Sequence, residues 1–426
     1  MQGFVIGQGL CWIEFVSSSH KMAESAIQSG ESMSSTVILG AARTPFGRLG
    51  GGLASLSGPE LGIHAAGAAL RRAAVSPEDV GYVVMGEVLQ AGVGMIPSRQ
   101  VSAGVGCPTS VGSDTINKVC ASGMRATAYG DLMIRAGEHD VVLTGGMESM
   151  SNAPYLLKKA RFGYTMGDGE LIDHMTSDGL TSTFTSRIMA EENSVVSAEI
   201  GCSRQDQDAW ALRSHQRAIA AQDAGHLAEE IEPVTINGRK GDTVVEADES
   251  PRRDTSAERL ASLRPVFSAD GATTAGNAPG VNDGAAALVL ASEEWAKAHG
   301  HAPLARIISE GHVADEYPYL VRTPAGAARA ALAKAGMSIS DVDLFEINEA
   351  FCSVVLSTID LLEADPDRFN VQGGAVAFGH PIGASGARLV GTLVHQLRRR
   401  GGGIGLAAIC SGAAQGDAML IEVLPA

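Results

Sequence analysis

Apolar residues recur along the chain at two spacings, one typical of helices and one typical of buried strands. Leu389, Leu393 and Leu397 lie four positions apart, so they share one face of a helix. Short, uninterrupted apolar runs such as Val141–Leu143 and Ile404–Leu406 are typical of strands that helices cover on both faces. The two patterns alternate and predict a layered α/β protein.

Several segments of the first part of the chain reappear in the same order in the last part. The matching pairs are Ala68–Val80 (AALRRAAVSPEDV) with Ala330–Val342 (AALAKAGMSISDV), Cys120–Arg125 (CASGMR) with Gly383–Arg388 (GASGAR), and Asp140–Thr144 with Gly403–Ala407. The members of each pair are 262 or 263 positions apart. A repeat at one nearly constant spacing predicts two related copies of one folding unit.

The repeat also predicts how the chain is divided. Residues 33–295 are expected to form an N-terminal half and residues 296–426 a C-terminal half. Residues from about 151 to 270 have no partner in the second half and are expected to be an inserted loop domain. Residues 1–32 are expected to be a tail outside the fold. Their apolar stretch follows no basic region and they contain no Arg, which fits neither a secretory nor a mitochondrial signal, so we expect a cytoplasmic protein.

Composition excludes several classes of protein. The 426 residues are 45% hydrophobic, which is too apolar for a disordered chain, and no apolar run approaches the roughly 18 residues of a membrane span. The net charge of −16 argues against a general nucleic-acid or anionic-membrane surface. The six cysteines are scattered without metal-like spacing, so we expect free thiols and no metal site. The 52 glycines suggest backbone packed close to other groups.

One position breaks the symmetry of the repeat. Where the second half has Gly383, the first half has Cys120, followed by a helical pattern. A thiol at a helix N-terminus is expected to have a lowered pKa and to react as a nucleophile. The alternative is a small buried cysteine in a tight helix–strand contact, which is common in proteins.

Three residues in the second half are candidate partners for this thiol. His380 lies in a glycine-rich turn before a helix, and His is the usual general base for a Cys nucleophile. Asn348 and Cys410 each follow a predicted strand, where the sites of α/β proteins gather. Each has a simpler explanation: a structural histidine, a turn residue and a buried thiol. Each is a weak signal alone, and together they are a specific one.

At these residues the chain resembles the thiolase family, from about Val37 to Pro425. The motifs that carry the resemblance are Asn117–Ala126 (NKVCASGMRA), Gly145–Asn152 (GGMESMSN), Gly276–Ala287 (GNAPGVNDGAAA), Asn348–Phe351 (NEAF), Gly373–Gly386 (GGAVAFGHPIGASG) and Cys410–Gly416 (CSGAAQG). The resemblance implies the thiolase fold: two repeated βαβαβαββ halves in a layered α-β-α-β-α arrangement, with an inserted loop domain. It also implies a homodimer or homotetramer.

The resemblance implies a role for each candidate. Cys120 matches the nucleophile that carries the acyl group, and His380 matches the residue that activates it and polarises the thioester. Asn348 matches the residue that holds a water in a first oxyanion hole with the histidine. Cys410 matches the acid/base that removes the α-proton of acetyl-CoA. The backbone N–H groups of Cys120 and Gly412 match a second oxyanion hole.

The resemblance also implies where coenzyme A binds, and where this chain departs from the family. Arg252 matches a loop-domain contact to the adenine end, and Asn277, Pro279 and Gly280 match the segment along the coenzyme. Pro279 stands where family members usually have a Ser that contacts coenzyme A, and Ala413-Ala414 replaces Gly-Gly.

A further departure lies at Thr185-Ser186-Arg187, which replaces a His-Met-Gly segment whose Met and His line the acyl pocket. We expect Ser186 and Arg187 to affect the acyl chain-length preference.

The function implied is the reversible Claisen condensation of two acetyl-CoA to acetoacetyl-CoA and CoA through an acyl-cysteine, with coenzyme A thioesters as substrates and no permanently bound cofactor. A longer-chain 3-ketoacyl-CoA thiolase of β-oxidation is the nearest alternative. A ketoacyl synthase would use two histidines, and Asn348 and Cys410 argue against it. A non-catalytic acyl-CoA-binding relative is a further alternative, which loss of a catalytic residue would favour.

Overall fold

The computed structural model describes residues 34–239 and 241–425. The chain divides into two compact units, Met1–Ser34 and Ser35–Ala426, and every element named below belongs to the second. The predicted tail, residues 1–32, lies outside the described residues. No helix in the described part of the chain is long and apolar enough to cross a membrane.

The two predicted halves have the same order of elements. The first half contains β1 (Thr36–Arg43), α2 (Gly58–Ala73), β3 (Tyr82–Gly86), α3 (Pro97–Gly104), β4 (Gly112–Ile116), α4 (Ser122–Arg135), β5 (Val141–Ser149) and β10 (Asn282–Ser292). The second contains β11 (Ala305–Ala314), α9 (Thr323–Ala335), β12 (Leu344–Ile347), α10 (Cys352–Leu362), α12 (Ser385–Arg399), β13 (Gly403–Ser411) and β14 (Gln415–Val423). The repeat found in the sequence is therefore a repeat of structure.

The second half lacks a regular third strand, unlike the first. At the place that corresponds to β4, Phe369 forms only an isolated bridge to Phe345. Pro366 begins a short 3₁₀ turn just before it, and Asn370 just after it has a left-handed φ of +44°. Neither conformation continues a strand, so the predicted strand is reduced to one bridge.

The strands form one ten-stranded sheet in the order β12-β13-β14-β11-β1-β10-β5-β3-β4, and β2 (Gly47–Arg48) pairs with β10 beside this path. The halves meet where β1 pairs with β11, over Val37–Arg306 and Ile38–Ala305. Counted outward from that junction, the strands of each half follow the same order: the last strand, then the fourth, then the second.

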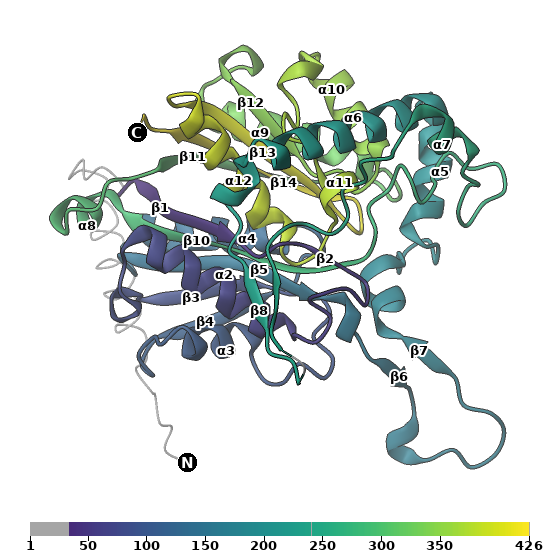
Figure 1. Ribbon diagram of the computed structural model, residues 1–426, viewed down its shortest axis with the longest axis horizontal. Helices are drawn as coiled ribbons and strands as arrows, with labels where there is room; N and C mark the ends of the chain where they lie inside the picture. Colours follow the sequence, from purple (N-terminus) through teal and green to yellow (C-terminus); the bar gives the residue numbers. More distant parts are fainter. Residues whose placement is uncertain (1–33, 240, 426) are drawn as a thin grey trace, which may run out of the picture. The chain divides into compact units, whose positions relative to one another are not determined.

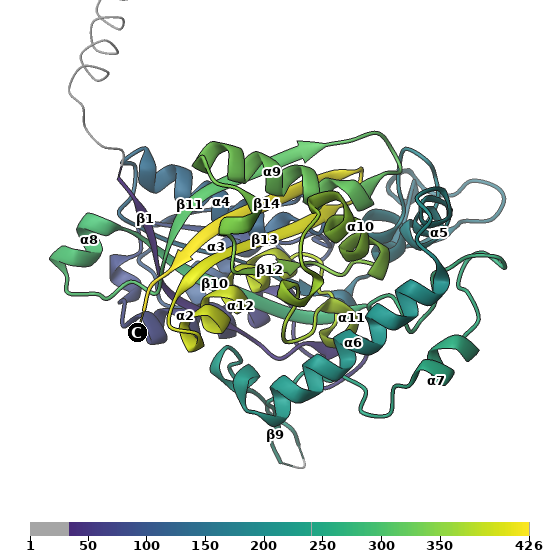
Figure 2. The same ribbon diagram turned by 90° about the horizontal axis from the view of Figure 1, so that it is seen from above.

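Helices cover both faces of each half of the sheet, and α4 and α12 form the layer between the halves (Figures 1 and 2). On the outer faces, α2 packs on β1, β10 and β5, and α9 packs on β11 and β14. The predicted leucine face of α12 is confirmed, since Leu389, Leu393 and Leu397 are all fully buried. This is the layered α-β-α-β-α arrangement that the resemblance implies.

Between β5 and β10 the chain leaves the sheet, in the region predicted to be inserted. The main elements there are β6 (Tyr155–Leu157), β7 (Leu171–Asp173), a π-helix (Met175–Leu180), α5 (Met189–Glu199), α6 (Arg204–Asp223), β8 (Val234–Ile236), β9 (Thr243–Val245) and α7 (Ala257–Ser262). Helix α6 begins at a capping box of Ser203 and Asp206. It packs against α10 and the short α11 (Ala375–Phe378) of the second half.

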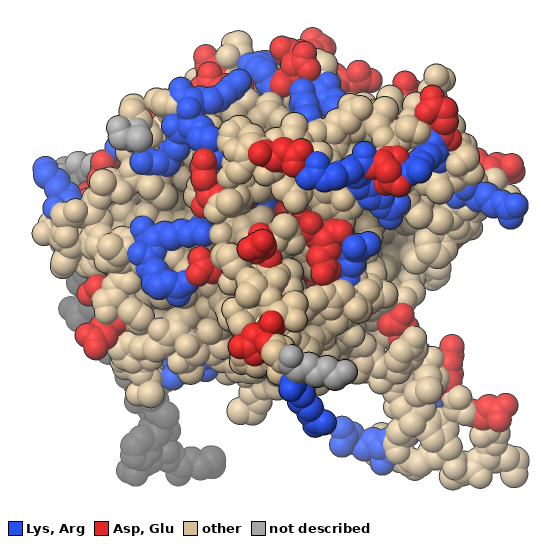
Figure 3. All heavy atoms as spheres, in the orientation of Figure 1, with Lys and Arg blue, Asp and Glu red and all other residues tan. Residues whose placement is uncertain are grey.

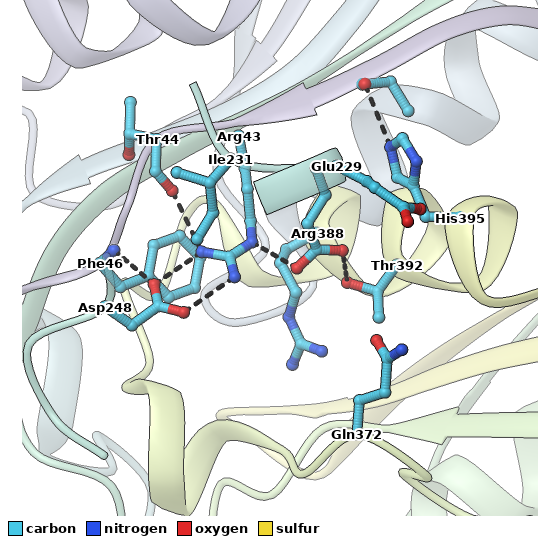
Figure 4. Close-up of polar contacts among 12 residues, drawn as sticks. Arg43, Thr44, Phe46, Glu229, Ile231, Asp248, Gln372, Arg388, Thr392 and His395 are labelled. Carbon is cyan, nitrogen blue, oxygen red and sulfur yellow. Dashed lines mark hydrogen bonds and ion pairs between the residues drawn. The ribbon is translucent and has the colours of Figure 1, made fainter. Parts of the chain in front are cut away.

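A buried ion network fastens this inserted region to the sheet (Figure 4). From β1, Arg43 donates from Nε to Glu230 Oε1 at 2.7 Å and from Nη1 and Nη2 to Asp248 at 2.7 and 2.8 Å. The second oxygen of Glu230 accepts a hydrogen bond from Thr392 of α12. All four side chains are buried. One arginine thus joins the sheet, the insertion and the central helix layer.

Candidate active site

The turn before α4 presents Cys120 to a buried cavity. Cys120 is 4% exposed, and Val119 before it has a left-handed φ of +47°, which is strained for a β-branched residue. Side chains hold this conformation: Asn117 Oδ1 accepts the N–H of Val119 at 3.0 Å. Ser122 Oγ accepts the N–H of Lys118 at 2.8 Å and donates to the Val119 carbonyl at 2.6 Å. The nucleophile turn is therefore rigidly positioned.

The expectation of a lowered thiol pKa at Cys120 is wrong. Burial raises the pKa of Cys120 to about 12, although the N–H groups of Gly412 and of Cys120 itself oppose the shift. The loss of hydration destabilises the buried thiolate by more than the helix N-terminus stabilises it. The resting group is a thiol, so a base must take its proton when the acyl group arrives.

His380 has the tautomer that such a base needs. Its Nδ1 lies 2.6 Å from Ser385 Oγ, and Ser385 donates its only proton to the Pro381 carbonyl at 2.9 Å. Ser385 can then only accept, so Nδ1 carries the proton and Nε2 keeps a lone pair. Burial, together with repulsion from Arg388, lowers the pKa of His380 to about 3. The ring is neutral and can accept a proton at Nε2.

Asn348 lies directly after β12 and faces this nitrogen. Its Nδ2 is 3.3 Å from His380 Nε2, and the side chain is fully buried. Its Oδ1 has no hydrogen-bond partner in the part of the chain that the structure describes. A buried amide oxygen left in this state is suited to hold a water molecule, so the geometry is compatible with the predicted role in an oxyanion hole.

Asn282, which the sequence did not single out, fixes the backbone of the histidine. Its Oδ1 accepts the N–H of His380 at 3.0 Å, and its Nδ2 donates to the Gly47 carbonyl at 2.8 Å and to Ser250 Oγ at 3.2 Å. Gly379, just before the histidine, has a φ of +109°, and a Cβ there would overlap the Asn282 amide. Glycine at this position therefore permits the close approach.

Glu148 is a second residue that the sequence did not single out. Its carboxylate is fully buried and accepts the N–H groups of Val88, Leu89 and Gly383 at 3.0–3.1 Å. Burial raises its pKa to about 7, although these hydrogen bonds oppose the shift. Glu148 thus fastens the turn that carries His380 to the loop after β3. Its place in the quoted motif Gly145–Asn152 was the only signal in the sequence.

Cys410 ends β13 beside the nucleophile. It is 1% exposed, and its pKa is raised by burial and by the neighbouring Cys120. In the turn that follows, the N–H of Gly412 is directed at the Cys120 thiol. Ala413 and Ala414, which replace the family's glycines, have left-handed φ values of +63° and +49°. The structure therefore brings both thiols and the two N–H groups of the predicted second oxyanion hole together.

These groups meet in a cavity of about 270 Å³. It is lined by Cys120, His380, Cys410 and Gly412 at the reactive end, and elsewhere by Met150, Leu180, Ile188, Met189, Ala190, Val266, Phe267, Leu320, Phe351 and Ile382, among others. Ser186 and Arg187 do not line it, contrary to expectation. Ser186 lies in a turn, with a φ of +60°, and Arg187 forms an exposed ion pair with Glu191. The chain reaches the cavity only after this turn, at Ile188.

A second cavity of about 380 Å³ adjoins the first. It is lined by Arg48, Leu49, His215, Ser250, Arg252, Asn282 and Val376, and it shares Ala275, Ala278, Pro279, Gly280 and Val281 with the reactive cavity. Of the predicted coenzyme contacts, Arg252, Pro279 and Gly280 lie here. Asn277 does not: its buried amide bonds to Thr274, Asp208 and Ala272, so it shapes the turn instead.

Among residues 34–239 and 241–425, no three His, Cys, Asp or Glu side chains are grouped so that they could hold a metal ion.

Replacing Ser385 by alanine is expected to lower kcat about 10-fold with little change in KM. The buried Nδ1–H of His380 loses its acceptor, and hydrogen bonds to charged groups are worth about 1.5–3 kcal/mol, so the imidazolium formed in catalysis suffers most. The pH–rate profile should shift with kcat. Ser309→Ala is the matched control, because that buried hydroxyl donates only to Ala331 on the far side of the sheet. A Ser385 variant with unchanged kcat would contradict this role.

Known proteins match nearly the whole of this chain. A family model described as "Thiolase, N-terminal domain" matches residues 36–294, and one described as "Thiolase, C-terminal domain" matches residues 301–423. An acetyl-CoA acetyltransferase of Chromobacterium violaceum is 45% identical over 386 residues, which cover 90% of this chain and 98% of that protein.

Solved structures agree. Acetyl-CoA acetyltransferase from Syntrophomonas wolfei matches with a TM-score of 0.90 at 39% identity, covering 92% of this chain and 100% of that one. Human mitochondrial 3-ketoacyl-CoA thiolase matches with a TM-score of 0.89 at 40% identity, covering 92% and 99%.

Fold and relatives together define an enzyme of the acyltransferase class. The chain belongs to the thiolase family. The alternative of a non-catalytic binding relative is therefore not supported.

Proposed function

We propose that this protein is an acetyl-CoA C-acetyltransferase, which reversibly condenses two acetyl-CoA into acetoacetyl-CoA and CoA. Relatives named acetyl-CoA acetyltransferase at 42–45% identity over nearly the full chain support this reaction. The observation that carries it is the convergence of Cys120, His380, Cys410 and Gly412 on one buried cavity. The substrates are coenzyme A thioesters, and the mechanism below needs no resident cofactor.

In the first half-reaction, the Cys120 sulfur attacks the thioester carbonyl of acetyl-CoA. The neutral Nε2 of His380 takes the thiol proton and returns it to the sulfur of the departing coenzyme, which leaves as a thiol. Negative charge develops on the carbonyl oxygen in between. Backbone N–H groups directed at that oxygen are worth about 2.7–4 kcal/mol each by analogy with other acyl-transfer sites, and those of Cys120 and Gly412 are the donors we assign.

In the second half-reaction, Cys410 in its thiolate form removes the α-proton of a second acetyl-CoA. Its pKa is raised by burial and by Cys120. Acylation leaves Cys120 unable to ionise, which removes the second of these two causes and favours the thiolate of Cys410. Asn348 stabilises the enolate through a water, whereas Nε2 of His380, which carries only a lone pair at this stage, has no proton to donate to it. The enolate carbon attacks the acetyl group on Cys120. The released Cys120 thiolate then takes the proton from Cys410, which restores both groups.

The cavity favours a short acyl chain over the longer-chain alternative. Its apolar wall includes Leu180, Met189 and Leu320, and Met189 lies against the Gly412 turn. Thiolysis of 3-ketoacyl-CoA substrates of four, eight and twelve carbons should give the highest kcat/KM at four carbons and at least a tenfold loss at eight. Equal or higher values at eight and twelve carbons would establish the longer-chain thiolase instead.

Met189→Ala should raise the ratio of C8 to C4 activity several-fold, because one missing methylene in an apolar pocket is worth about 1–3 kcal/mol of discrimination. Met95→Ala is the control, since that side chain is 86% exposed.

We also propose that the protein assembles into a homo-oligomer, as the family resemblance implies. The β6–β7 hairpin projects from the body at the lower right of Figure 1 and carries charged side chains of both signs (Figure 3). It carries exposed apolar side chains, with Phe162 at 91% and Met166 at 96% exposure. Exposed apolar patches of this kind mark protein–protein contacts. A second copy of the chain is the partner we assign, in a homodimer or a homotetramer.

A cytoplasmic location remains our proposal. Cys107, Cys120, Cys202, Cys352 and Cys410 are free thiols, and reduced thiols are typical of reducing compartments. Cys11 lies outside the described residues.

A further inference from the structure

Arg48 lies at the rim of the second cavity, and its side chain has no role in the reaction proposed above. It ends β2, and its backbone is fixed by pairing with Asn282 of β10 and by donation from its N–H to Glu249. Its side chain is exposed and lines the cavity. Its guanidinium makes no ion pair or hydrogen bond with any residue of 34–239 or 241–425. The backbone is ordered while the charged group is left unpaired.

Arg252 lines the same cavity from the inserted region, and its guanidinium is also without a partner among the described residues. Its backbone N–H donates to His215 Nδ1 at 3.2 Å. Burial, with repulsion from Arg252, lowers the pKa of His215 to about 4, so the histidine is neutral. The positive charge at this rim therefore comes from two arginines that lie more than 200 positions apart in the sequence.

Neighbouring arginines show that pairing is usual in this acidic chain. Arg253 is bound to Asp223 through both terminal nitrogens, and Arg259 pairs with Asp254. Carboxylates are abundant, since the net charge is −16. Two unpaired guanidinium groups on one cavity wall leave a local positive field that attracts an anion.

We propose that Arg48 and Arg252 together bind a phosphate group of the coenzyme, so that Arg48 is a specificity-determining residue for the coenzyme. Guanidinium groups match phosphate oxygens in geometry and charge. The cavity shares the wall Ala278–Val281 with the reactive cavity, so a thioester that reaches Cys120 through it leaves its phosphorylated end at this rim. The proposal rests on the proposed function for the identity of the thioester.

The phosphate can belong to the 3′-phosphate or to the diphosphate of coenzyme A, and substrate fragments distinguish the two. The experiment is thiolysis of acetoacetyl-pantetheine, which carries no nucleotide, with CoA, dephospho-CoA or pantetheine as the accepting thiol. For Arg48→Gln we expect KM for CoA to rise about tenfold with kcat unchanged, and KM for pantetheine to stay at the wild-type value. If Arg48→Gln does not raise the KM for dephospho-CoA, which lacks the 3′-phosphate, Arg48 binds the 3′-phosphate. If it raises the KM for dephospho-CoA as much as that for CoA, Arg48 binds the diphosphate.

Arg253→Gln is the matched control, because it removes an exposed arginine next to Arg252 that is paired with Asp223, and it should leave every KM unchanged. KM values of Arg48→Gln equal to wild type for all three thiols would overturn the proposal. An equal rise with pantetheine would also overturn it, since that points to a disturbed fold. Activity with pantetheine is measured in the same series, so a failure of the proposed reaction would appear there separately, as absent turnover in the wild type.

Discussion

Replacing Cys120 by alanine is expected to reduce the thiolysis of acetoacetyl-CoA by more than about a thousandfold. Loss of a nucleophile typically costs far more than loss of a group that only supports it. No other group can take its place, because Cys410 lies in the same cavity but is assigned to the α-proton. The rate is followed by the loss of the enolate absorbance of acetoacetyl-CoA. More than a tenth of wild-type activity in this variant would rule out the acyl-cysteine mechanism.

Two variants separate this effect from general damage. Cys107→Ala removes a buried cysteine outside both cavities and should keep nearly full activity. Cys410→Ala should still accept a labelled acetyl group from acetyl-CoA on Cys120, while forming no acetoacetyl-CoA. Peptide mass spectrometry locates the label. A Cys410 variant that condenses at the wild-type rate would show that another group removes the α-proton.

Replacing Arg43 by methionine is expected to lower the free energy of unfolding by about 3–5 kcal/mol, because it leaves the carboxylates of Glu230 and Asp248 buried and unpaired. Chemical denaturation followed by tryptophan fluorescence measures the change. Arg71→Met is the control. Its ion pair with Glu232 is largely exposed, with 65% of the Arg71 side chain accessible, and such pairs contribute about 0–1 kcal/mol. Equal losses in both variants would contradict the importance of the buried network.

The same network makes stability depend on pH in a defined direction. Burial alone would raise the pKa of Glu230, but the charge of Arg43 outweighs burial and holds the pKa below its ordinary value of 4.5. The folded protein therefore binds fewer protons at Glu230 than the unfolded chain. The contribution is present above about pH 4.5 and is lost as the pH falls. In Arg43→Met this part of the acid sensitivity should be absent.

Much of the architecture could be predicted from the sequence because the repeat and the helical periodicity of Leu389–Leu397 report directly on burial. The nucleophile could be predicted because Cys120 breaks the repeat. The supporting residues could not. Ser385 and Asn282 act by hydrogen bonding to His380, and the local sequence does not specify how the turn around His380 is oriented toward them. The high pKa of the Cys120 thiol depends on burial by segments that are distant in the sequence. The sequence also could not show which residues of the loop before α5 face the cavity. Ser186 and Arg187 were expected to influence the acyl pocket, but Ile188 and Met189 line it.

The repeat has a consequence for how many active sites one chain can hold. Gly383 is the counterpart of Cys120 in the second half, yet a side chain there would overlap the Met147 carbonyl and crowd the Glu148 carboxylate. Glu148 occupies the position where a mirrored site would need its own open space. The two halves therefore have different roles. The first half carries the reacting sulfur of Cys120, and the second half has a closely packed glycine at the matching position, in the turn that carries His380.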